Sequence, residues 1–67
     1  MKVFEDNLII GDEYYLDDIK ISKGFFIGFD KSNDPMFYPT KSMGYITSPE
    51  QNGTIDFPKS NFAYEEV

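Results

Sequence analysis

The amino-acid sequence predicts a mainly β protein: a small, strongly bent antiparallel sheet or an SH3-like or OB-like barrel of five to seven short strands. Short stretches rich in Ile, Phe and Tyr alternate with polar residues at a period of two, which is typical of half-buried strands. Turn-forming residues interrupt these stretches every eight to twelve residues or so, as in small all-β domains. No segment combines helical spacing of apolar residues with helix caps. Because 67 residues are too few for a sandwich, we expect a bent sheet or barrel that forms a single domain over residues 1–67, with no linker.

The longest expected strand runs from Ile19 to Phe29 and continues, through a turn at 31–34, into a returning strand that starts at Pro35. Most apolar side chains of the first strand fall at odd positions, so we expect those positions to face the core: Ile19, Ile21, Phe25, Ile27 and Phe29. Lys23 interrupts this apolar face and Gly24 follows it. We therefore expect a bulge or a sharp bend at these two residues.

The length of the turn decides which residues of the returning strand share the core face. A four-residue loop places Asp30 opposite Pro35, and Met36 and Tyr38 then join the core. A slip of one residue would move Met36 and Tyr38 to the other face.

The same register predicts a second apolar patch, formed by Phe26 and Phe37 on the face away from the expected core. Phe37 would lie over the bare backbone of Gly28, an arrangement that stabilises sheets. Two interpretations follow. Either the patch is a contact surface for a partner or a second copy, or the chain folds back and covers it with one of three aromatic residues, Phe4, Phe62 or Tyr64.

Before the central hairpin, the sequence predicts a first strand within residues 1–10, interrupted by polar residues, and a short strand at 14–16. Asp17 and Asp18 form a polar break, with a single turn at 17–20 as an option.

After the hairpin, we expect a strand at 43–47, a long loop at 48–53 and a strand at 54–57 with Ile55 and Phe57 on one face. A last short strand is expected at 62–64, with the residues after it frayed.

Composition argues against several classes of function. The chain has a net charge of −6, and all its cations are lysines. Proteins that bind nucleic acid directly carry basic surfaces, so we expect no direct contact with DNA or RNA. An acidic surface favours a partner protein with a basic surface, although it also serves solubility.

The absence of His and Cys removes the usual zinc ligands and the commonest catalytic bases and nucleophiles. Asp30, Ser32 and Asp34 have the spacing of the first ligands of a calcium loop. That pattern then needs Gly and Glu where this chain has Pro35 and Lys41. We therefore expect no enzyme activity, no metal site and no cofactor.

No stretch approaches the roughly 20 apolar residues of a membrane helix, and Glu5 and Asp6 stand where a signal peptide would be apolar. We expect a cytoplasmic protein without membrane contact. The chain is rich in residues that have AT-rich codons, namely Phe, Tyr, Ile, Asn and Lys, and it has no Arg. This usage indicates a low-GC bacterium, or its phage or plasmid, as the source. The expected location is then the bacterial host cell.

An acidic and aromatic cluster near the N-terminus is the most suggestive local feature. Its members are Asp12, Glu13, Tyr14, Tyr15, Asp17 and Asp18. One interpretation is a short core strand with solvated acidic ends. The other is a binding surface, where tyrosines supply rigid contact area and carboxylates attract a basic partner. Glu50 and Asp56 are further candidates outside the cluster.

The sequence therefore favours a small, acidic, non-catalytic binding protein. We expect an inhibitor that occupies the basic, nucleic-acid-binding surface of a larger protein, such as a nucleic-acid enzyme, with carboxylates standing in for phosphates. Phage and plasmid proteins directed against host defence or transcription provide an analogy in size and charge. The alternative is a structural or accessory module that assembles through strand edges or the Phe26/Phe37 patch, and a homodimer is left open. A weaker option is a reader of methyl-lysine or peptides on an SH3-like barrel.

Overall fold

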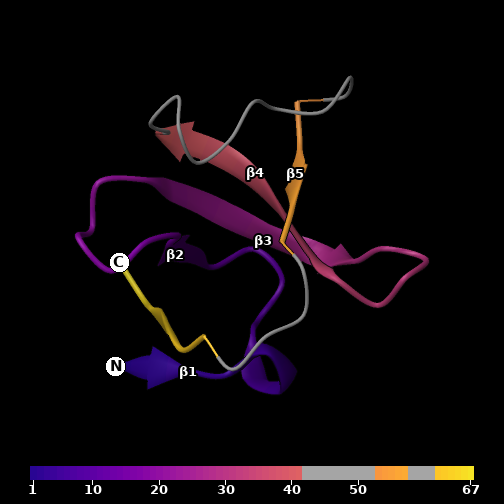
Figure 1. Ribbon diagram of the computed structural model, residues 1–67, viewed down its shortest axis with the longest axis horizontal. Helices are drawn as coiled ribbons and strands as arrows, with labels where there is room; N and C mark the ends of the chain where they lie inside the picture. The colour runs from indigo at the N-terminus through magenta and orange to yellow at the C-terminus, as the bar shows by residue number, and fades with distance from the viewer. Residues whose placement is uncertain (42–52, 58–61) are drawn as a thin grey trace.

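The computed structural model describes residues 1–41, 53–57 and 62–67. Its elements are β1 (Lys2–Val3), the 3-10 helix η1 (Glu5–Asn7), β2 (Glu13–Tyr15), β3 (Lys23–Phe29), β4 (Pro35–Lys41), β5 (Ile55–Asp56) and β6 (Tyr64–Glu65). The strands form two antiparallel sheets, one of β1 and β6 and one in the order β2-β3-β4-β5 (Figure 1). The predicted mainly β class is therefore confirmed. Among the described residues, strand pairing does not close into a ring.

The C-terminal residues connect the two sheets. Beyond β6, Glu66 forms a bridge with Tyr14 of β2, and its N–H donates to the carbonyl of Met1 at 3.1 Å. The N–H of Val67 donates to the carbonyl of Glu13 at 3.0 Å. The expected fraying after residue 64 is wrong, because these residues take part in the backbone hydrogen bonding of both sheets.

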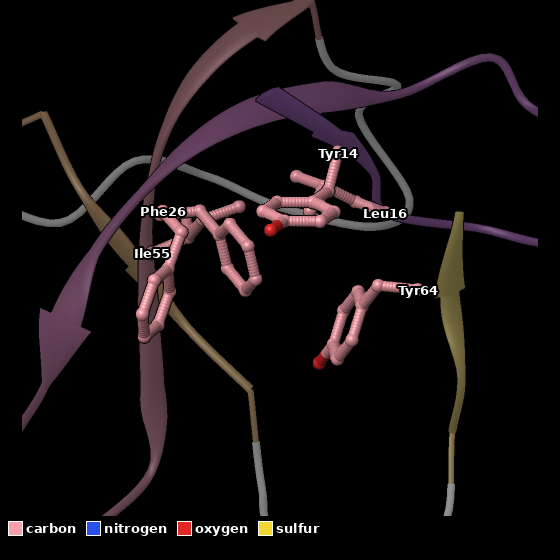
Figure 2. Packing of buried hydrophobic residues seen from close by; sticks show 6 residues of the cluster. Tyr14, Leu16, Phe26, Ile55 and Tyr64 are labelled. Atoms are coloured by element: carbon pink, nitrogen blue, oxygen red, sulfur yellow. The ribbon is translucent and has the colours of Figure 1, made fainter. Parts of the chain in front are cut away.

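The core lies on the opposite face of β3 from the one that we expected. Phe26 and Phe37 are 1% and 0% exposed, whereas Phe25 and Ile27 are 40% and 39% exposed. The core cluster consists of Tyr14, Leu16, Phe26, Phe37, Ile55 and Tyr64 (Figure 2). The residues expected in the core but largely exposed are Ile19, Phe25, Ile27, Phe29 and Tyr38.

The Phe26/Phe37 patch is accordingly buried and not exposed to solvent. Tyr64 of β6 covers it, with its ring centroid 5.2 Å from that of Phe37, and Phe62 packs against the cluster. Phe4 takes no part and is 59% exposed. The interpretation in which the chain folds back over Phe26 and Phe37 is confirmed, and the contact-surface interpretation is wrong.

The turn between β3 and β4 is one residue longer than expected. Asp30 Oδ1 accepts hydrogen bonds from the N–H groups of Ser32 and Asp34, at 2.8 and 2.9 Å, and so organises the turn from its first residue. The turn consequently spans 30–34, and Phe29 rather than Asp30 lies opposite Pro35. By itself, this difference of one residue would exchange the faces of β4 relative to the expected register.

Two irregularities in β3 change the register further. It shifts between Lys23 and Gly24, as the sequence predicted, and again between Phe26 and Gly28. The second shift offsets that of the turn, so Phe26 and Phe37 share a face as expected, although Phe37 lies opposite Phe26 and not opposite Gly28. The reversal therefore concerns only which face is covered: Tyr64 packs on the face of Phe26 and Phe37, which we expected to lie away from the core.

Other expectations are confirmed where the chain is described. The strand at 14–16 corresponds to β2, and the turn at 17–20 is closed by a 3.3 Å hydrogen bond from the N–H of Lys20 to the carbonyl of Asp17. The first strand is limited to Lys2–Val3 and is followed by η1.

In the C-terminal half, β5 lies within the expected strand 54–57, and β6 begins at Tyr64, where the strand 62–64 was expected to end. The expected strand at 43–47 and nearly all of the loop at 48–53 lie outside the described residues. Within the described part of the chain, no helix has the length and apolar character required to cross a membrane.

Candidate functional site

The predicted acidic and aromatic cluster is divided between the two faces of β2. Tyr14 points inward, is 1% exposed, and accepts a 3.0 Å hydrogen bond at its hydroxyl from the N–H of Ile9. Tyr14 is therefore a core residue and not a contact residue. Its neighbours Glu13 and Tyr15 are half-buried and point to the opposite face.

Asp17 stabilises its own loop. Its two carboxylate oxygens accept hydrogen bonds from the N–H groups of Ile21 and Ser22, at 2.9 and 3.0 Å. A carboxylate that accepts two backbone N–H groups holds the loop firmly, and Lys20 within this loop has φ of +59°. Asp18, by contrast, is exposed.

The fold adds two carboxylates that the sequence analysis had placed in a frayed end. The bridge between Tyr14 and Glu66 positions Glu66 beside Asp12. A hydrogen bond with the Asp12 side chain, followed by desolvation and the charge of Asp12, raises the pKa of Glu66 above its usual value. Two carboxyl groups are therefore held together at the junction of the two sheets.

Glu65 lines an open cleft beside this junction. The cleft has a volume of about 460 Å³, and its lining residues are Lys2, Asp17, Asp18, Lys20, Phe62, Ala63 and Glu65. We call the carboxylates of the cleft and the junction, namely Asp12, Asp17, Asp18, Glu65 and Glu66, the acidic surface.

Lys20 shows how this surface holds a cation. Its Nζ lies 3.2 Å from Glu65 Oε2 and 5.9 Å from the centroid of the Tyr15 ring. The hydrogen bond from Lys20 is the main cause that lowers the pKa of Glu65. Because both side chains are partly exposed, the pair contributes little to folding stability, and a lysine of a partner could compete for the same carboxylate.

A second pair of carboxyl groups lies away from the acidic surface, at the turn of the hairpin. A hydrogen bond with the side chain of Asp56 and backbone hydrogen bonds from Asp34 and Ser32 lower the pKa of Asp30. Asp56 is thus separate from the predicted cluster. Glu50, the other candidate outside the cluster, is not among the described residues.

The part of the chain that the structure describes contains no group of three or more carboxylates arranged to hold a metal ion. Asp30, whose spacing to Ser32 and Asp34 resembles a calcium loop, uses its side chain to accept backbone N–H groups of the turn.

The sequence could not have assembled the acidic surface by itself. Asp12, Asp17 and Asp18 are close in sequence, but Glu65 and Glu66 are about fifty residues away and reach them only through strand pairing. The only signal was the apolar alternation of Phe62 and Tyr64 directly before two acidic residues.

Comparisons with known proteins identify no relative. No protein-family model matches this sequence, and neither the curated proteins nor the solved structures contain a significant match.

Proposed function

We propose that this protein is a non-catalytic binding protein whose acidic surface occupies a basic surface of a larger protein, of the kind that otherwise binds nucleic acid. The observation that supports the proposal is that strand pairing assembles carboxylates from separated segments in two groups, Asp17, Asp18 and Glu65 at the cleft and Asp12 with Glu66 at the sheet junction. The segments are residue 12, residues 17–18 and residues 65–66.

The contact between Asp12 and Glu66 strengthens the argument. The hydrogen bond with the Asp12 side chain is the main cause that raises the pKa of Glu66, followed by desolvation and by repulsion from the charge of Asp12. A lysine or arginine from a partner would relieve this repulsion, and the benefit is gained only on binding. The chain carries twelve acidic residues and only six lysines, so its own cations are too few to neutralise the acids.

The proposed role as a mimic of nucleic acid follows from the chemistry of such a partner. A surface that binds phosphates presents several cations in a row, and carboxylates compete with phosphates for them. The role as an inhibitor directed against a host enzyme, of phage or plasmid type, belongs to the same proposal.

The alternative of an accessory module that assembles through the Phe26/Phe37 patch is not retained, since both rings are buried. Assembly of such a module through strand edges stays a prediction.

The test compares two single charge reversals at exposed aspartates. Asp18→Lys alters the acidic surface, whereas Asp6→Lys makes the same change in η1, outside that surface. Asp17 is unsuitable, because its replacement would break the loop that it holds. The wild-type chain and both variants are immobilised and exposed to a bacterial lysate depleted of nucleic acid, and bound proteins are eluted with a salt gradient.

We expect the wild type and Asp6→Lys to retain a nucleic-acid-binding protein that elutes at moderate salt and is displaced by added DNA or RNA. Asp18→Lys should lose it. Equal retention by both variants, or a captured protein that DNA and RNA do not displace, would contradict the proposal.

A further inference from the structure

The sheet β2-β3-β4-β5 has an outer face that points away from the core. Glu13, Phe25 and Tyr38 lie side by side across three strands, and Met36 lies beside Asp56 on the fourth. Thr40 Oγ1 donates a hydrogen bond of 2.6 Å to Glu13 Oε2, and so links β4 to β2 over the outer side of β3. We call this surface the outer face.

The middle of the outer face is apolar. Phe25, Ile27 and Tyr38 are 40%, 39% and 52% exposed, on two neighbouring strands of the sheet. Gly53 lies against the Tyr38 ring: a Cβ there would approach Tyr38 Cε1 to 3.1 Å. Small monomers rarely leave several large apolar side chains together in water, so this region has the character of a contact surface.

The two ends of the outer face carry opposite charges. At the open end of the hairpin, Lys23 lies directly opposite Lys41, and like charges in that position repel. At the turn end, Asp56 and Asp30 are hydrogen-bonded through their side chains. The lysine end thus holds a pair of like charges that an opposite charge would relieve, and the turn end offers carboxyl groups that can supply it.

We propose that the outer face binds a second copy of this chain in a two-fold dimer. In an isologous interface, each surface element meets its counterpart across the axis. With the axis through the apolar middle, the lysine end of one copy meets the carboxylate end of the other, and the repulsion between the two lysines is relieved.

The distribution of charge favours a second copy over other occupants. The outer face carries Glu13, Asp30 and Asp56 together with Lys23 and Lys41, so its charges nearly balance, although the whole chain has a net charge of −6. Two copies therefore repel least when these faces meet. A strongly basic partner would be repelled by the lysine end, and a strongly acidic one by the carboxylate end.

The dimer is expected to be weak. The accessible surface of the described molecule is only 4347 Å², whereas stable interfaces commonly cover about 800 Å² on each partner. Association should therefore be measured by sedimentation from micromolar to millimolar concentrations.

A charge exchange tests the proposal. One variant, Lys23→Glu/Lys41→Glu, makes both ends acidic, and another, Asp56→Lys, introduces a cation beside Asp30 at the turn end. Each variant alone should dimerise at least about tenfold more weakly than the wild type. An equimolar mixture should form a heterodimer more tightly than either variant dimerises alone, because the lysine introduced at position 56 then meets the glutamates of the other variant. Circular dichroism confirms that each variant is folded, and Phe25→Ser provides an uncharged variant that should also be monomeric.

A wild-type chain that stays monomeric at millimolar concentration would overturn the proposal, and so would variants that dimerise separately as strongly as the wild type. Asp18→Lys, which alters only the acidic surface, should leave dimerisation unchanged. The dimer and the proposed function therefore succeed or fail separately.

Discussion

The two faces of the β3–β4 hairpin carry similar side chains in different surroundings. On the inner face, the ring of Phe37 has centroids of other rings at 5.2 to 6.5 Å, from Tyr14, Phe26, Phe57 and Tyr64. On the outer face, Phe25 and Tyr38 lie directly opposite each other and remain 40% and 52% exposed. Figure 2 shows Tyr64 reaching from β6 toward the inner rings. Among the described strands, none covers the outer face as β6 covers the inner face.

The difference teaches that burial in this fold is decided by coverage and not by the hydrophobicity of a face. Gly24 on the inner face of β3 and the buried Ser22 just before the strand are less apolar than Phe25 and Ile27 of the outer face. Their small size lets neighbouring groups come close: a Cβ on Gly24 would lie 3.2 Å from Leu16 Cδ1. The C-terminal strand then completes the cover.

Replacement of Phe37 should have the largest effect on stability. Phe37→Ala removes a completely buried ring and should lower the free energy of unfolding by about 3–5 kcal/mol. Phe25→Ala, its outer-face counterpart, should cost about 1 kcal/mol or less. Urea denaturation followed by circular dichroism measures both values.

A domain of this size is marginally stable, so Phe37→Ala could remain unfolded in water. Phe37→Leu keeps most of the volume and should cost about 1–2 kcal/mol, still more than Phe25→Leu. Equal losses on the two faces would show that the core is not where the structure places it.

A methyl group on the inner face should be the next most damaging change. In Gly24→Ala, the new Cβ would stand 3.0 Å from the carbonyl oxygen of Tyr38 and 3.2 Å from Phe37 Cβ. Because one of these neighbours is backbone, we expect a loss of about 1–3 kcal/mol. Lys23→Ala, the adjacent residue on the outer face, should change stability by no more than about 0.5 kcal/mol. A neutral Gly24→Ala in thermal melts would contradict the close packing described here.

These contrasts explain how much of the fold could be predicted from the sequence. Strand composition and turn residues were sufficient for the mainly β class, for the hairpin and for the bulge at Lys23 and Gly24. The face of the hairpin was not predictable, because aromatic residues occupy both faces. Phe26 and Phe37 share a face as expected, but the strand that covers this face, β6, comes from the distant C-terminus.

The candidate site was predictable only in part. Asp12, Asp17 and Asp18 belong to the acidic surface, but Tyr14 belongs to the core. Glu65 and Glu66 reach the surface through a pairing between distant segments, which local patterns do not encode.

The two faces can also be compared by the effect of alkaline pH on folding stability, because the inner face contains the buried hydroxyl of Tyr64. Burial, with a smaller contribution from the charge of Glu5, raises the pKa of Tyr64 well above its usual value of 10.0. The folded state then keeps the proton where the unfolded state releases it. Stability is fully present below pH 10 and falls above it, by at most about 1.4 kcal/mol per pH unit.

Tyr64→Phe should flatten this loss between pH 10 and pH 12, as measured by urea denaturation at a series of pH values. Tyr38→Phe removes a hydroxyl from the outer face and is the matched control, for which we expect the wild-type slope. If both variants kept the wild-type slope, another group would be responsible for the alkaline loss.

The smallest effect is expected from the polar link on the outer face. Thr40→Val removes the donor that binds Glu13 Oε2 at 2.6 Å and keeps the shape of the side chain. Because the bond is exposed, water can replace it, and the loss should be about 0.5–1 kcal/mol. Glu13→Ala removes the acceptor and should cost about as much, and the double variant should cost no more than either one alone, since the two changes break the same bond. Losses that simply add in urea denaturation would show that Glu13 and Thr40 act independently, and that the outer face is not tied across its three strands.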